Sequence, residues 1–164
     1  MSASIHASTV LVGESGVLIR GASGAGKSLL ALALIERARL AGNYGALVAD
    51  DRVWLEVVAG RLVARGAPAL AGVCEFRGQG LVEVPSAETG VIRLIVDIAD
   101  RGKPPPRIPE EADKYTTLCG VERPRLRVDL SPGLEVGVLA VFFALGRLDG
   151  SSWRKNDLDG KLFA

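Results

Sequence analysis

The sequence contains few cysteines and few aromatic residues, and both shortages limit what the protein can be. Its two cysteines, Cys74 and Cys119, are far apart and lack the CxxC or other spacing of a metal site. We therefore expect two reduced thiols, as in a cytoplasmic protein, rather than a disulfide framework. Aromatic residues form 5% of the chain, so the core must be built from valine, leucine, isoleucine and alanine.

An excess of charge of one sign is also missing. The 20 lysines and arginines nearly balance the 19 aspartates and glutamates, which argues against nucleic acid or an anionic membrane as the main partner. The chain has no apolar run of the roughly 20 residues that span a bilayer. Residues 1–12 lack the basic and long apolar regions of a signal peptide. We therefore expect a cytoplasmic protein that binds neither nucleic acid nor membrane.

The chain length and the apolar content predict one domain. A chain of 164 residues, 48% of them apolar, is long enough to bury a single core. We assign residues 1–148 to this domain and the polar residues 149–164 to a C-terminal tail.

Apolar periodicity predicts both strands and helices, and therefore an α/β fold. The expected strands cover 5–12, 16–20, the apolar run from residue 45 to the next two carboxylates, 53–58, 61–64, 91–98 and 125–130; the expected helices cover 28–40 and 133–145. Residues 103–109, KPPPRIP, must form a loop because their prolines exclude helix and central strand. Some strands form hairpins and others precede helices, so we expect a mixed β-sheet flanked by helices.

A glycine-rich loop, GASGAGKS, connects an expected strand to an expected helix. Its sequence fits the pattern G-x-x-x-x-G-K-[ST] of a P-loop, in the required context. Glycines let successive backbone N–H groups surround a β-phosphate, and the helix N-terminus adds its positive dipole end. Lys27 would reach the β- and γ-phosphates, and the Ser28 hydroxyl would bind Mg²⁺. The predicted nucleotide-binding residues are Gly21, Ala22, Ser23, Gly24, Ala25, Gly26, Lys27 and Ser28.

Two adjacent carboxylates, Asp50 and Asp51, end the apolar run that follows the first expected helix. Neighbouring residues at a strand end point to opposite faces, so the two side chains are expected to have different roles. One could face Mg²⁺ through water while the other faces the acceptor of the phosphoryl group. The alternative is a polar strand end with a turn at Asp51-Arg52.

Together these segments resemble the catalytic domain of HPr kinase/phosphorylase. The resemblance runs from about His6 to Leu145 and includes HASTVLVGESGVLIRGASGAGKS, LVADD and CEFRGQGLVEV. The pattern Glu75-x-Arg77-Gly78-x-Gly80 is more specific to this family than the glycine loop. That family uses ATP to phosphorylate a serine of the small phosphocarrier protein HPr, and the chain resembles its short members, which lack the separate N-terminal domain.

The resemblance implies an ATP- and Mg²⁺-dependent protein serine kinase whose partner is an HPr-like phosphocarrier protein. It also implies a P-loop fold of the HPr kinase and PEP carboxykinase type, with residues 1–148 as the catalytic domain. Asp51 matches the catalytic base of the family, and Glu75 matches a second carboxylate linked to Mg²⁺. His6 matches an active-site histidine that could hold Asp51 or the phosphate in place. Arg107 corresponds to a catalytic arginine in a flexible loop, and Lys27 keeps its phosphate role.

One segment departs from the family. Longer members have a basic, asparagine-containing stretch before the C-terminal helix, tied to phosphorolysis, where this chain has LSPGLEV with Leu134 and Glu135. We therefore expect a kinase with little phosphorylase activity. The longer helical region of the hexameric members is also mostly missing, but we still expect a homo-oligomer.

Two other functions remain open. The chain could be a P-loop kinase of a small molecule, although no arginine-rich lid is evident. It could also be a nucleotide-binding regulatory module without turnover, although Lys27, Asp51 and Glu75 are all intact.

Overall fold

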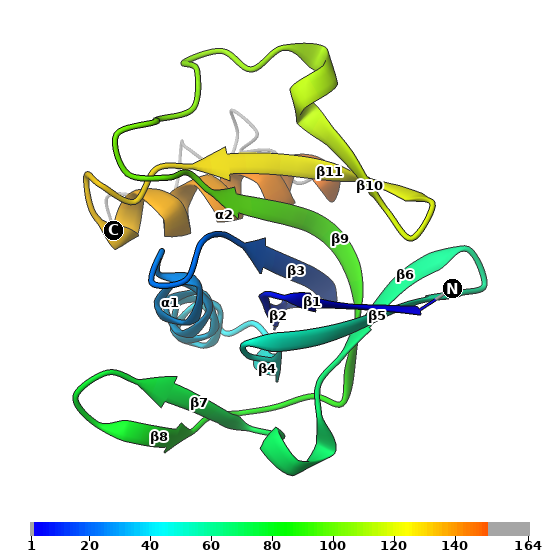
Figure 1. Ribbon diagram of the computed structural model, residues 1–164, viewed down its shortest axis with the longest axis vertical. Helices are drawn as coiled ribbons and strands as arrows, with labels where there is room; N and C mark the ends of the chain where they lie inside the picture. Colours follow the sequence, from blue (N-terminus) through cyan, green and yellow to red (C-terminus); the bar gives the residue numbers. More distant parts are fainter. Residues whose placement is uncertain (1, 151–164) are drawn as a thin grey trace.

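A computed structural model describes residues 2–150, which form a curled β-sheet with two α-helices on one face (Figure 1). The strands are β1 (Ser2–His6), β2 (Ser8–Val12), β3 (Ser15–Arg20), β4 (Gly45–Ala49), β5 (Arg52–Val58), β6 (Arg61–Arg65), β7 (Val73–Phe76), β8 (Gly80–Glu83), β9 (Thr89–Ile98), β10 (Tyr115–Leu118) and β11 (Val121–Val128). The α-helices are α1 (Lys27–Leu40) and α2 (Leu134–Leu148), and two 3-10 turns are η1 (Pro68–Leu70) and η2 (Glu111–Lys114).

The main sheet is mixed, as the sequence predicts. Its strand order is β1-β5-β6-β9-β3-β2-β4, and β11 and β10 extend it from β9. Strand β9 is parallel to β3 and β11, whereas β2 is antiparallel to both β3 and β4. The β7–β8 hairpin forms a small separate sheet. This hairpin and the loop between β9 and β10 project on opposite sides of the molecule (Figure 1).

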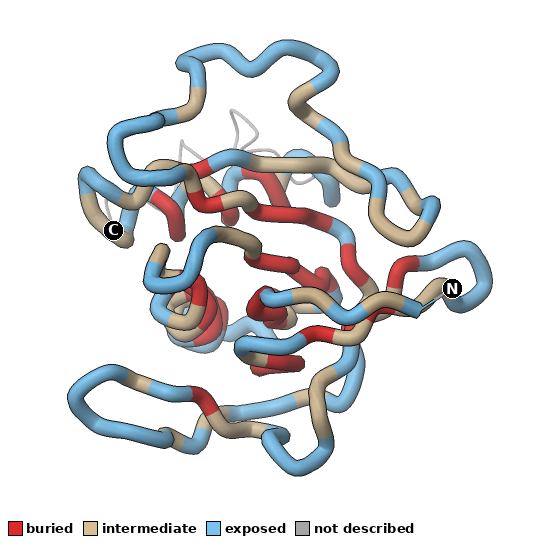
Figure 2. Tube along the Cα trace, in the orientation of Figure 1, coloured by how far each residue is buried: buried red, intermediate tan, exposed pale blue. Residues whose placement is uncertain are grey.

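Buried side chains lie on both faces of the central strands (Figure 2). Residues of one strand alternate between the faces, so Val17 and Ile19 of β3 pack in the cluster under the helices while Leu18 packs in the other. The second cluster is enclosed by the curled strands β5 and β6. Because both faces are covered, the central strands are apolar over nearly their whole length.

Helix α1 buries residues at helical spacing against β2 and β4, namely Leu30, Ala31, Leu34, Ile35 and Ala38. Helix α2 packs on α1 and β11. Its Gly137 allows close packing, because a Cβ there would lie 2.5 Å from the side chain of Leu130. Both helices begin within one residue of the predicted positions. Within residues 2–150 no helix is both long and apolar enough to cross a membrane.

Two predictions of local structure are wrong, and one hairpin was not predicted. The expected strand 5–12 is divided at Ala7, because the chain leaves β5, the partner of β1, and continues between β3 and β4 as β2. The strand expected at 125–130 begins earlier, since β10, which the sequence did not indicate, pairs with residues 121–124. The β7–β8 hairpin was not predicted either. The proposed tail lies outside the described residues from position 151 onward.

Candidate functional site

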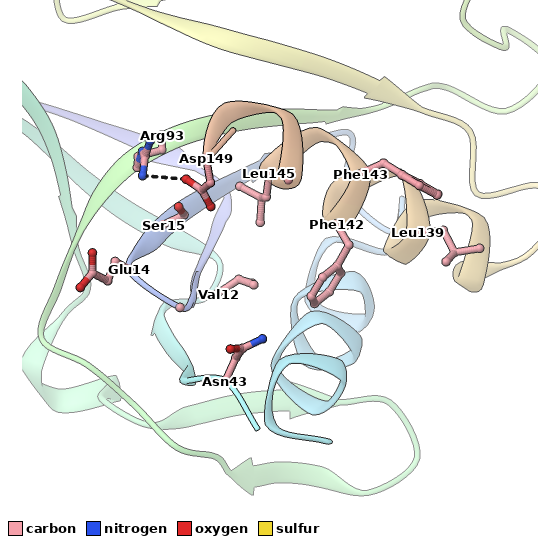
Figure 3. Close-up of a pocket in the computed structure, with 12 residues that line it drawn as sticks. Val12, Glu14, Ser15, Asn43, Arg93, Leu139, Phe142, Phe143, Leu145 and Asp149 are labelled. Carbon is pink, nitrogen blue, oxygen red and sulfur yellow. Dashed lines mark ion pairs between the residues drawn. The ribbon is translucent and has the colours of Figure 1, made fainter. Parts of the chain in front are cut away.

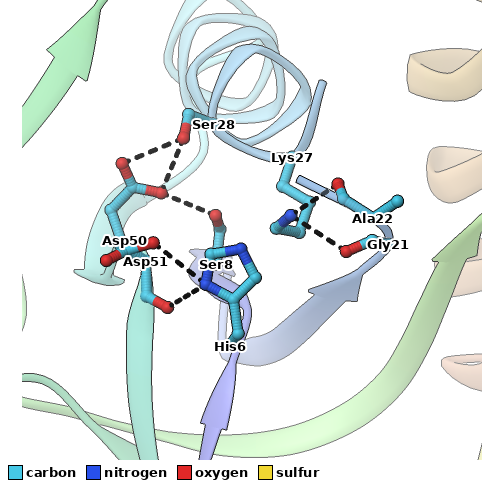
Figure 4. Close-up of polar contacts among 8 residues, drawn as sticks. All are labelled: His6, Ser8, Gly21, Ala22, Lys27, Ser28, Asp50 and Asp51. Carbon is cyan, nitrogen blue, oxygen red and sulfur yellow. Dashed lines mark hydrogen bonds and ion pairs between the residues drawn. The ribbon is translucent and has the colours of Figure 1, made fainter. Parts of the chain in front are cut away.

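The sheet topology brings the predicted site residues to one edge. Because β3 and β4 are both antiparallel to β2, their C-terminal ends meet on either side of the start of β2. The glycine loop follows β3, Asp50 follows β4, and Ser8 begins β2. Strands β1 and β5 add His6 and Asp51, since His6 is paired with Arg52. Figure 4 shows these groups side by side in front of the N-terminal end of α1.

The glycine loop has the backbone and the charge that phosphate binding requires. Gly24 and Gly26 have φ of +75° and +104°, a region that other residues rarely adopt. The Lys27 ammonium donates hydrogen bonds of 2.9 Å to the carbonyl oxygens of Gly21 and Ala22, and the residue is 6% exposed. The first turn of α1 contains no acidic residue of its own, so no side chain of the helix neutralises its positive dipole end. The loop is therefore suited to an anion.

Asp50 is the centre of a hydrogen-bonded cluster. Its Oδ1 accepts hydrogen bonds from the hydroxyls of Ser8 at 2.6 Å and Ser28 at 2.9 Å. Its Oδ2 lies 3.0 Å from the same Ser28 hydroxyl and accepts a hydrogen bond from the Cys74 thiol at 3.2 Å. The carboxylate and the Ser28 hydroxyl thus form a pair of hard oxygen groups at the foot of the glycine loop, which is the chemistry that Mg²⁺ prefers.

Cys74 enters this cluster as a thiol and not as a thiolate. Burial raises the pKa of Cys74 to about 12, and the hydrogen bond to Asp50 and the negative charge of that carboxylate act in the same direction. The sulfur is protonated at neutral pH and can donate to Asp50. Cys74 and Cys119 are both free, with no disulfide between them. Sequence reasoning missed the roles of Ser8 and Cys74 at the site, because the pattern of their segments assigns a chemical role to neither residue.

Asp51 has surroundings quite different from those of its neighbour. Its φ of +68° turns the chain between β4 and β5, and its side chain is 80% exposed. The His6 Nδ1 lies 2.9 Å from the Asp51 Oδ1 and also 2.9 Å from the main-chain oxygen of Asp51. The two adjacent carboxylates thus differ in surroundings: Asp50 accepts hydrogen bonds from Ser8 and Ser28, whereas Asp51 is exposed beside His6 (Figure 4).

Two other predicted site residues lie apart from this cluster. Glu75 is exposed on β7, on the side opposite to Cys74, because adjacent strand residues point in opposite directions. Within residues 2–150, no group of three or more histidine, cysteine, aspartate or glutamate side chains could hold a metal ion. Arg107 is exposed in the loop after β9 and lines a different pocket of about 460 Å³ with Arg127 and Arg147.

An ionic cluster supports the base of the glycine loop. Arg20, the last residue of β3, makes two hydrogen bonds to Asp97 at 2.7 and 2.8 Å, and Arg125 adds a third at 2.6 Å. Burial alone would raise the pKa of Asp97, but the hydrogen bonds and charges of the two guanidinium groups outweigh it and lower that pKa. The cluster joins β3, β9 and β11 directly before Gly21. No local pattern in the sequence indicated it.

A pocket of about 530 Å³ lies at the opposite end of the sheet (Figure 3). The turn 13–15, Asn43 after α1 and the aromatic residues Phe142 and Phe143 of α2 line it. Its charged groups include the ion pair between Arg93 and Asp149, at 3.0 Å. None of the glycine-loop residues and neither Asp50 nor Asp51 borders this pocket. Its volume therefore does not identify the site of phosphate chemistry.

Known proteins resemble the chain over most of its length. The family described as HPr serine kinase C-terminal domain matches residues 1–145. The HPr kinase/phosphorylase of Chlorobium phaeobacteroides is 32% identical over 159 residues, which cover 87% of this chain and 43% of that protein. The HPr kinase/phosphorylase of Clostridium perfringens is 34% identical over 146 residues, covering 82% of this chain and 45% of that protein. The chain thus spans less than half the length of these curated relatives.

A solved structure shares the architecture. The structure of the Hpr(Ser) kinase/phosphatase from Coxiella burnetii matches with a TM-score of 0.74 at 22% identity, over 92% of this chain and 99% of that chain. At this identity the likeness shows the fold. It confirms the predicted α/β class with a mixed sheet and flanking helices.

Proposed function

Because the chain belongs to the HPr serine kinase C-terminal domain family, we propose that it is an ATP- and Mg²⁺-dependent protein kinase that phosphorylates a serine of an HPr-like phosphocarrier protein. The observation that carries the proposal is the contact between Ser28 and Asp50 at 2.9 Å beside the loop that contains Lys27. A phosphate-binding loop next to paired oxygen ligands is the arrangement that phosphoryl transfer from a metal-bound nucleotide requires.

The nucleotide would be held by the glycine loop and the start of α1. Backbone N–H groups of this segment would bind the β-phosphate, and the Lys27 ammonium would exchange the carbonyls of Gly21 and Ala22 for phosphate oxygens. Ser28 and Asp50 would hold Mg²⁺, directly or through water, and Glu75 would approach it from the β7–β8 hairpin. Bound Mg²⁺ supplies positive charge that neutralises the phosphates.

Asp51 is the proposed base. Its carboxylate would take the proton from the acceptor serine as that oxygen attacks the γ-phosphorus, and the bond to the bridging oxygen of ADP breaks. The exposed position of Asp51 suits contact with a protein acceptor. The His6 ring, 2.9 Å from the carboxylate, would hold it in the orientation that accepts the proton.

Arg107 is proposed to stabilise charge on the transferred phosphoryl group. Its loop would have to close toward the glycine loop, because the pocket that Arg107 lines contains none of the glycine-loop residues. An arginine that closes over the γ-phosphate supplies charge where the transition state develops it.

Incubation with γ-labelled ATP and Mg²⁺, with and without purified HPr-type protein, tests the proposal. We expect label on a serine of the carrier with the wild-type chain and its loss with Asp51→Asn. The matched control is Glu14→Gln, which neutralises an exposed carboxylate at the opposite end of the sheet and should retain the wild-type rate. Label on a small molecule instead would indicate a small-molecule kinase. Nucleotide binding without transfer to any acceptor would indicate a regulatory module, and either result would contradict the proposal.

A further inference from the structure

Three side chains from three separate elements surround the Asp50 carboxylate. Ser28 comes from the first turn of α1, Ser8 from the start of β2, and Cys74 from β7. Ser28 is part of the glycine-loop motif, whereas Ser8 and Cys74 stand in segments that share the family resemblance but have no assigned chemical role. Their contacts, at 2.6 and 3.2 Å, need a reason other than nucleotide binding, since both residues are buried, with exposures of 0% and 1%.

The backbone position of Ser8 is fixed by strand pairing. Its strand is paired on both sides, with Ser8 opposite Ile19 of β3 and the next residue opposite Ala49 of β4. The side chain can therefore change its contact only by rotation about its own bond, and in the observed rotamer it donates to Asp50. Cys74 approaches the other carboxylate oxygen from the β7–β8 hairpin. Ser8 and Cys74 donate to different oxygens of the Asp50 carboxylate, and together they fix the orientation of its plane.

The orientation of this plane decides what Ser28 can do. While Asp50 accepts the proton of the Ser28 hydroxyl, the oxygen lone pairs of Ser28 remain available to a cation at the glycine loop. If the carboxylate rotated, Ser28 would lose its acceptor and could turn its proton toward that cation. We propose that Ser8 and Cys74 are positioning residues that hold Asp50 so that Ser28 presents its lone pairs to the metal-bound nucleotide. This inference rests on the proposed function.

The neighbouring residue on β2 provides a matched control. Thr9 is as buried as Ser8, but its hydroxyl has no hydrogen-bond partner among the described residues. It lies on the other face of the sheet, because adjacent strand residues alternate. Removing the Thr9 hydroxyl by Thr9→Val therefore changes a buried hydroxyl on the same strand without touching Asp50.

The test measures metal binding without turnover, by electron paramagnetic resonance of Mn²⁺ with ADP. Outer-shell partners of metal ligands typically change affinity by about 10- to 100-fold when they are removed. We expect this loss in Mn²⁺ affinity for Ser8→Ala and for Cys74→Val, which keep similar volume but lose the donor. Thr9→Val leaves Asp50 untouched, and Cys74→Ser retains a donor to it. Both variants should bind Mn²⁺ as the wild type does. The midpoint of thermal unfolding is measured for each variant.

The outcomes separate this inference from the proposed function. Wild-type affinity in folded Ser8→Ala and Cys74→Val would overturn the positioning roles while leaving nucleotide binding intact. Equal losses in Cys74→Ser and Cys74→Val would show that a donor at this position does not preserve Mn²⁺ affinity, and would also overturn the role of Cys74. Failure of the wild-type chain to bind Mn²⁺ with ADP would refute the proposed function, and with it the inference. If Ser8→Ala does not fold, Ser8→Thr keeps the donor and must retain Mn²⁺ affinity.

Discussion

The two ends of the central sheet differ in their backbone conformation and in the side chains that gather there. At the end where β3, β4 and β9 terminate, Gly26 and the non-glycine residue Asp51 have positive φ, and polar groups are buried beside them. At the other end, the turn 13–15 and α2 border a concavity of about 530 Å³ whose lining mixes apolar and aromatic side chains with polar and charged ones. Convergent polar groups and not the size of the hollow therefore mark the site, because buried polar groups persist only where they are paired or used.

Ion pairs show the same contrast. Asp97, at the site end, is 16% exposed and is shared by two arginines. Arg93 and Asp149, at the other end, form a single pair whose members are both more than two-fifths exposed. Water screens the second pair far more than the first. Mutations at the two ends should therefore change the free energy of unfolding by different amounts. The following experiments compare them, beginning with the largest expected effect.

Replacing Lys27 by alanine should abolish phosphoryl transfer while the fold survives. The ammonium lies within the glycine loop, where it would neutralise phosphate oxygens, and its removal also leaves the carbonyls of Gly21 and Ala22 without their donor. Label transfer from ATP and circular dichroism provide the measurements. Arg93→Ala, at the opposite end, is the control and should retain transfer. A transfer rate in Lys27→Ala equal to that of the wild type would refute the assignment of this loop.

Neutralising each of the two adjacent carboxylates should change a different kinetic property, the transfer rate for Asp51 and the Mg²⁺ dependence for Asp50. Asp51→Asn removes the base and should lower the transfer rate by about 10²- to 10⁴-fold, while ATP still binds. Asp50→Asn should instead raise the Mg²⁺ concentration needed for half-maximal activity, because Asp50 contacts Ser28. Rates measured over a Mg²⁺ titration distinguish the two. Identical titration curves and identical losses would contradict the division of roles.

The reverse reaction should be much slower than the forward one. Phosphorolysis brings inorganic phosphate to a phosphoserine at the glycine loop and yields serine and pyrophosphate, so it needs cations aimed at the incoming anion. The segment before α2 supplies none, and Glu135 in the first turn of α2 is paired with Arg37. Loss of one such donor typically costs about 10²- to 10³-fold. Pyrophosphate release from phosphorylated carrier and phosphate provides the rate, and equal rates in both directions would show that another group replaces the missing cation.

Acid should destabilise the site end through Asp97. The folded-state pKa of Asp97 is lowered, so its stabilising contribution is complete above its unfolded pKa of about 3.9 and is lost as pH falls through that value toward the folded pKa. Asp97→Asn should reduce the free energy of unfolding at pH 7 by about 1–3 kcal/mol. The difference between variant and wild type should shrink below about pH 4. Urea unfolding at several pH values measures it, and a difference independent of pH would contradict the ionic origin.

The smallest effect is expected at the exposed pair. Removing it by Asp149→Asn should cost no more than about 1 kcal/mol at low salt, and less as salt increases. Urea unfolding at two ionic strengths gives the comparison with Asp97→Asn. If the exposed pair proved as costly as the Asp97 cluster, burial would not explain the contrast between the two ends.

Local patterns predicted the parts of the fold whose geometry depends on near neighbours. Both α-helices follow from apolar spacing, and they begin within one residue of the expected positions. The break at Ala7 could not be predicted in this way. Residues 5–12 read as one apolar run, and only the presence of β5 on one side and of β3 and β4 on the other divides it.

For this protein, the sequence by itself determined the glycine loop, the helix that follows it and the adjacent aspartates, because each depends on residue types at fixed short spacing. It also carried the family resemblance. Only the tertiary structure decided that Ser8 and Cys74 contact Asp50, that Arg20 and Arg125 share Asp97, and that Arg107 lies in another pocket. These contacts join residues far apart in the chain, and strand order, which local propensity does not encode, brings them together.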